Sequence, residues 1–144
     1  MHAPLRSIAL TLSAISTLAL AAQVSAAPTD RQREFAYAMM TCHHHAALMQ
    51  KYFHGDIPAR VPQRAHYSEL ASTAAGKKYV ADHIDSHALR EDAVQQLDQL
   101  LRSKNYKDLS PQEREEHMGA TWTHIIGTCN EVAAKPPAAG TSKK

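Results

Sequence analysis

The chain has few cysteines and none of the short motifs that mark common catalytic sites. Its 144 residues include two cysteines, far apart, so no Cys-x-x-Cys redox, zinc or haem-attachment motif is present. It also has no Gly-x-Ser-x-Gly elbow, no phosphate-binding glycine loop and no His-Glu-x-x-His zinc-hydrolase signature. We therefore predict a protein that is not an enzyme and that requires no cofactor.

The chain also lacks an excess of charge of one sign. Sixteen lysines and arginines balance fourteen aspartates and glutamates, and the two signs are interspersed. Proteins that bind nucleic acid usually carry a basic patch or stripe, because phosphate contacts supply most of the affinity. The composition thus predicts no nucleic-acid partner.

Long apolar runs are confined to the N-terminus. Arg6 precedes an apolar stretch over Ile8–Ala22, and the small residues Val24, Ser25 and Ala26 follow it. This order is typical of a secretory signal peptide over residues 1–26, with no membrane span left after its removal. Together with two cysteines that can pair, it predicts a periplasmic or secreted protein.

The remaining residues predict one small domain. Residues 27–134 have room for a single modest core. Residues 135–144 contain two prolines, a glycine and small polar side chains, which favours a disordered tail.

Apolar residues recur in steps of three and four along most of this domain, which predicts helices. Thr29 and Gln32 have the spacing of a capping box, and Ser110 and Glu113 repeat it before the last helix. Between residues 62 and 104 the pattern allows either two or three helices. We expect an all-α, up-and-down bundle of four to five helices.

Both cysteines lie on the apolar sides of their predicted helices. Cys42 falls near the middle of the first helix, and Cys129 falls near the end of the last. We predict that they form one long-range disulfide that staples the bundle. Trp122 lies on the same side of the last helix as Cys129, which predicts a core position.

Histidines offer one candidate metal site. His83 and His87 stand four residues apart, with Glu91 one turn further, so an unbroken helix would place all three on one face. Such a face could bind Zn²⁺, Cu²⁺ or Ni²⁺. The alternative is a surface pair without a ligand, and the site requires that the helix continue past Ser86.

A second apolar stripe lies on the first helix, opposite its core side. It consists of Tyr37, Met40, His44 and Leu48, and Arg60 lies in the following loop near its end. Aromatic residues and methionine are enriched in interface cores, so the stripe is a candidate surface for another periplasmic protein or a second copy of the chain. The alternative is that this helix is central and buried on both sides.

An exported helical domain of this length with one long-range disulfide resembles periplasmic immunity proteins that neutralise type VI secretion amidases, and small acid-stress chaperones. The resemblance covers architecture alone and assigns no residue. We expect a non-enzymatic protein-binding module, such as an inhibitor or immunity protein. A periplasmic metal-binding protein and an acid-stress chaperone are the alternatives.

Overall fold

The computed structural model describes residues 26–54, 61–102 and 105–138. These residues form five α-helices and one short 3₁₀-helix, and they contain no strand. The all-α prediction is confirmed. Nearly all of the predicted signal peptide, Arg60 and the last six residues of the predicted tail lie outside the described residues.

The two longest helices begin where the sequence predicts. Helix α1 covers Asp30–Tyr52, and helix α5 covers Pro111–Ala133. Each starts with a complete capping box, in which the cap hydroxyl accepts from the third residue's backbone N–H and that residue's side chain accepts from the cap's N–H. Contacts between neighbours in sequence therefore define both N-termini.

The ambiguous middle of the chain forms three helices. Helix α2 covers Arg64–Ala75, α3 covers Lys77–His83 and α4 covers His87–Leu101. Gly76 separates α2 from α3 with a φ of 91°, a conformation that favours glycine. Ser86 separates α3 from α4, because its hydroxyl accepts from the backbone N–H of Leu89 at 3.4 Å and caps the new helix. A 3₁₀-helix, η1 over Tyr106–Asp108, precedes α5.

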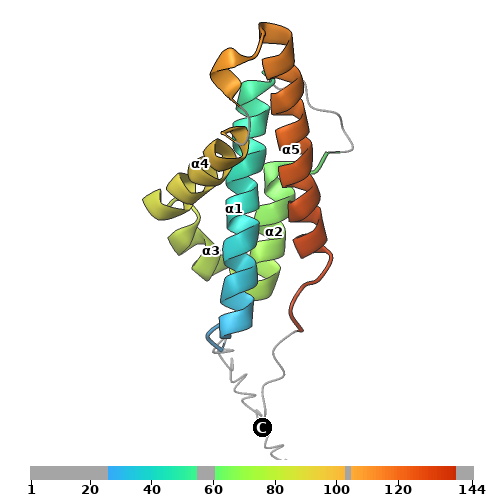
Figure 1. Ribbon diagram of the computed structural model, residues 1–144. Helices are drawn as coiled ribbons and strands as arrows, with labels where there is room; N and C mark the ends of the chain where they lie inside the picture. The colour runs from blue at the N-terminus through green and yellow to red at the C-terminus, as the bar shows by residue number, and fades with distance from the viewer. Residues whose placement is uncertain (1–25, 55–60, 103–104, 139–144) are drawn as a thin grey trace, which may run out of the picture.

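Helix α1 is the central element of the bundle (Figure 1). It packs against α2, α4 and α5, while α4 and α5 contact each other much less than either contacts α1. In Figure 1 the pair α3 and α4 lies on one side of α1, and α5 lies on the other. Residues of α1, α4 and α5 line a groove between α4 and α5. None of the described helices is long and apolar enough to cross a membrane.

The predicted disulfide is present at the centre of this packing. Cys42 on α1 and Cys129 on α5 are joined; their Cα atoms are 5.8 Å apart, and the two residues are 87 positions apart in sequence. Closing a loop of that length stabilises the fold by roughly 4 to 5 kcal/mol in the chain-entropy account. Trp122 is 3% exposed, which confirms its predicted core position.

Candidate ligand-binding groove

The groove between α4 and α5, called here the α4–α5 groove, is a cavity of about 480 Å³ that opens to solvent. Three helices line it, and the disulfide lies in its base. The lining residues are Tyr37, Ala38, Thr41, Cys42 and His45 on α1, Gln96, Gln99 and Leu100 on α4, and His124, Ile125, Thr128, Cys129 and Val132 on α5.

The base of the groove is apolar and rigid. Cys42, Ile125 and Cys129 are all buried, and the disulfide ties the α1 wall to the α5 wall. None of the lining residues is a lysine, arginine, aspartate or glutamate. The groove therefore offers apolar contact area without a fixed charge.

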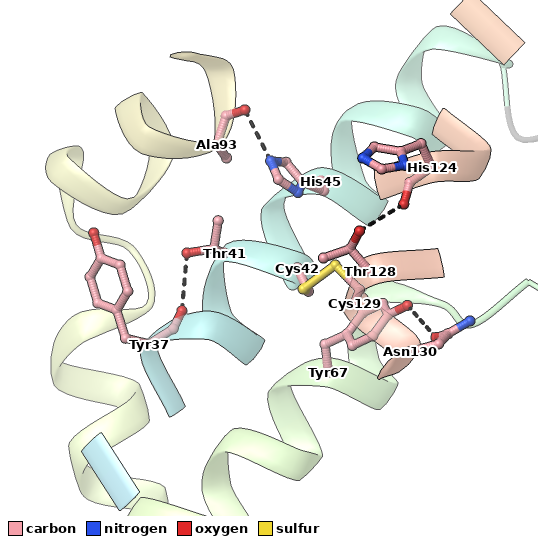
Figure 2. Close-up of a disulfide and its surroundings, with 10 residues drawn as sticks. All are labelled: Tyr37, Thr41, Cys42, His45, Tyr67, Ala93, His124, Thr128, Cys129 and Asn130. Carbon is pink, nitrogen blue, oxygen red and sulfur yellow. Dashed lines mark hydrogen bonds between the residues drawn. A yellow bond between two sulfur atoms is a disulfide. The ribbon is translucent and has the colours of Figure 1, made fainter. Parts of the chain in front are cut away.

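His45 is the most deeply buried polar residue of the lining, with 3% of its surface exposed. Its Nε2 lies 3.0 Å from the carbonyl oxygen of Ala93 on α4 (Figure 2). A carbonyl can only accept, so Nε2 carries the proton and donates. Burial lowers the pKa of His45, which keeps the ring neutral. In this tautomer Nδ1 is a hydrogen-bond acceptor, and no described residue donates to it.

Two threonines beside the disulfide have already committed their hydroxyl protons. Thr41 donates to the backbone oxygen of Tyr37 at 3.0 Å, and Thr128 donates to that of His124 at 3.1 Å (Figure 2). Their oxygens can still accept, but these two hydroxyls are not available as donors to a ligand.

Tyr37 lies at the edge of the groove with 41% of its surface exposed. Its hydroxyl donates to the carboxylate of Asp92 on α4, and this bond raises the pKa of the tyrosine. The contact ties α1 to α4 on one side of the groove, as the disulfide ties α1 to α5 on the other.

The predicted partner stripe is not a free surface. Met40 is fully buried, and the Nε2 of His44 bonds the carbonyl oxygen of Ile84 at 2.6 Å. Leu48 is partly buried against the core, so Tyr37 alone of these four is largely exposed. The prediction of an open stripe is wrong, because α4 packs on α1 and the end of α3 contacts His44 through Ile84. The predicted Arg60 contribution lies outside the described residues.

The structure does not place the predicted metal ligands His83 and His87 on one helix face. The chain turns at Ser86, so His83 ends α3 while His87 begins α4, and the two do not share one helix face. His83 Nδ1 lies 2.7 Å from the carbonyl oxygen of Tyr79, and His87 Nδ1 lies 3.4 Å from a carboxylate oxygen of Glu91. No group of three or more histidine, cysteine, aspartate or glutamate side chains among the described residues is placed to hold a metal ion.

The sequence analysis did not predict the α4–α5 groove, although it could have predicted that the α1 and α5 walls lie side by side. A disulfide between Cys42 and Cys129 requires that their neighbours one turn away, including His45 and Ile125, lie near each other. The α4 wall gave no such signal, because Gln96 and Gln99 look like ordinary solvent-facing residues of an amphipathic helix.

Comparison of the chain with protein-family models, with curated proteins and with solved structures finds no match.

Proposed function

We propose that the protein is an exported, non-enzymatic binding protein, and that it holds a small, uncharged, mostly apolar molecule in the α4–α5 groove. One observation carries the proposal: an uncharged groove whose lining includes a buried histidine with an unpartnered acceptor nitrogen.

The size and position of the groove support this function. Sites for small molecules are typically concave, about 300 to 1,000 Å³ in volume, and are often found between the helices of bundles. The groove's 480 Å³ falls in that range. Because the disulfide fixes Cys42 against Cys129, two of the three walls are held in place before a ligand arrives, which lowers the entropic cost of binding.

The chemistry of the lining supports the choice of ligand class. A charged ligand in this groove would lose water without gaining a countercharge, and such desolvation is costly. An apolar ligand instead gains about 25 cal/mol for each Å² of apolar surface removed from water.

The same lining supports binding rather than catalysis. Both cysteines are consumed by the disulfide, and the hydroxyls of Thr41 and Thr128 bond to backbone oxygens. Acidic side chains that could act as a catalytic pair are absent from the groove lining. Elsewhere among the described residues, several carboxylates on exposed helix faces form local ion pairs, including those of Asp82 and Asp98.

Two threonines on α5 provide a matched test. Thr123 and Thr128 are both exposed, and each donates its hydroxyl to the carbonyl four residues earlier, but only Thr128 lines the groove. The probe is N-phenyl-1-naphthylamine, an uncharged aromatic amine whose fluorescence rises in apolar surroundings. We expect saturable binding to the wild type, unchanged binding to Thr123→Trp, and at least about tenfold weaker binding to Thr128→Trp, a loss of about 1.4 kcal/mol.

Failure of the wild type to bind the probe saturably would contradict the proposal. Equal binding by the two tryptophan variants would also contradict it, because the probe would then occupy another surface. Circular dichroism and thermal unfolding of both variants establish that each is folded.

A second candidate is the protein-binding module that the sequence predicts. Tyr37 favours it, because an exposed tyrosine beside an apolar groove resembles the aromatic anchors of protein interfaces. In that case the groove receives an apolar side chain of a partner. A purified partner whose affinity falls with Tyr37→Arg, but not with Val94→Arg at another exposed apolar position on α4, would favour this candidate.

A further inference from the structure

We propose that the ligand of the α4–α5 groove carries an N–H or O–H group and donates a hydrogen bond from it to Nδ1 of His45. The inference rests on the proposed function, and it narrows the ligand from any apolar molecule to neutral alcohols, phenols and amines with an apolar body.

The contact of His45 with α4 fixes the tautomer of its ring. Nε2 of His45 lies 3.0 Å from the Ala93 carbonyl, and this contact requires a proton on Nε2. Ala93 itself is fully buried in α4, so the fold holds this pair in place from both sides. The lone pair on Nδ1 is therefore fixed in position as an acceptor.

Leaving the Nδ1 acceptor of His45 without a hydrogen bond costs free energy. Buried polar side-chain atoms nearly always have a partner, and an unsatisfied one costs about 1 to 3 kcal/mol. Nδ1 has no donor among the described residues. The hydroxyls of Thr41 and Thr128, also in the lining, donate elsewhere. Nδ1 has almost no exposed surface in the unliganded protein, so a ligand supplies the missing donor only if the side chains around His45 shift as it binds.

An unpaired acceptor on His45 would also make the groove selective among ligands. A site that has a buried hydrogen-bonding group rejects analogues without the matching group, because the protein group then stays unpaired. The lining also includes the apolar side chain of Ile125 and the disulfide. Most affinity should come from apolar burial, and the choice among ligands of similar shape should come from His45.

The experiment compares two probes that differ at one nitrogen. N-phenyl-1-naphthylamine has an N–H group, and its N-methyl derivative does not. We expect the wild type to bind the first about tenfold more tightly, which corresponds to one hydrogen bond of about 1.4 kcal/mol. In His45→Phe, which keeps a buried ring but has no acceptor, the two affinities should agree within about twofold.

The difference in affinity between the two probes distinguishes loss of the acceptor from a general structural effect of His45→Phe. General loosening of the groove would weaken both probes equally, whereas loss of the acceptor removes only the difference between them. Because the methyl group also adds bulk, a preference for the N–H probe that persists in His45→Phe would overturn the inference.

A second measurement on the wild type covers the case in which His45→Phe does not fold. The ¹⁵N chemical shift of His45 Nδ1 should move when the N–H probe binds, and should move much less with the N-methyl probe. Equal binding and equal shifts with the two probes would overturn the role of His45 while leaving the groove as a binding site. No binding of either probe would overturn both proposals.

Discussion

At the scale of single residues, His45 both lines the α4–α5 groove and makes stability depend on pH. The residue is only 3% exposed, and this burial lowers its pKa. His43 on the same helix is half-buried, and desolvation lowers its pKa too, although the Arg64 carbonyl at 3.0 Å partly offsets this effect. Both histidines take up a proton more readily in the unfolded chain, where the ordinary pKa is about 6.5.

This difference predicts loss of stability in mild acid. Below pH 6.5 the unfolded state binds more protons than the folded state, so the free energy of unfolding falls as pH decreases toward the lowered folded-state pKa values. We expect His45→Gln, whose amide can still donate to Ala93, to show a smaller decrease between pH 7.5 and pH 5 in urea unfolding. Equal decreases in wild type and variant would show that His45 does not carry this dependence.

Trp122 provides the corresponding test of the core. It is 3% exposed and packs with Met118 and Ile125 in the main apolar cluster. Truncation to alanine should lower the free energy of unfolding by about 3 to 5 kcal/mol, because it removes apolar contacts and leaves a cavity. Val94→Ala, at a position 51% exposed, is the control and should change it by no more than about 0.5 kcal/mol.

At the scale of helices, Gly76 decides how the middle of the chain is divided. Its φ of 91° and ψ of 147° lie in a region that other residues rarely adopt, and a Cβ atom added there would meet nothing within 4 Å. The cost of Gly76→Ala is therefore backbone strain, and we expect destabilisation by about 1 to 3 kcal/mol.

Gly127 is the matched control for this substitution. It lies in exposed helical backbone of α5, also with nothing within 4 Å of an added Cβ. Gly127→Ala should stabilise the protein by up to about 1 kcal/mol, since alanine has the higher helix propensity. Urea unfolding of both variants measures the two opposite effects. A neutral Gly76→Ala would mean that the α2–α3 boundary tolerates an ordinary side chain.

Helix boundaries were the part of the fold that local sequence predicts best. Thr29, Ser86 and Ser110 are hydroxyl residues that cap α1, α4 and α5, and each cap bond forms between neighbours in sequence. The prediction of a metal site was wrong because Ser86 caps a new helix. His83 and His87 therefore lie on different helices, and their four-residue spacing does not place them on one face.

The partner stripe failed for a different reason. Periodicity shows which sides of α1 are apolar, but it does not show which neighbour covers each side. Met40 is fully buried because α1 packs on three other helices, and an apolar face opposite the core is expected for a central helix.

At the scale of the whole molecule, the long-range disulfide is what the sequence predicts best about the site. The apolar spacing around Cys42 and Cys129 predicts their pairing, and that pairing brings the α1 and α5 walls of the groove together. The turns at Gly76 and Ser86 have local sequence signals, but the path of α4 also depends on its packing against α1, which has no simple sequence signature. The α4 wall, and therefore the complete groove, could be located only from the structure.

A crystal structure of the protein with N-phenyl-1-naphthylamine is the most direct test of whether the α4–α5 groove is a binding site. We predict the probe between α4 and α5, its rings against Ile125 and the disulfide and its N–H within hydrogen-bond distance of His45 Nδ1. A probe bound elsewhere, or a groove filled by the protein's own side chains, would contradict the claim.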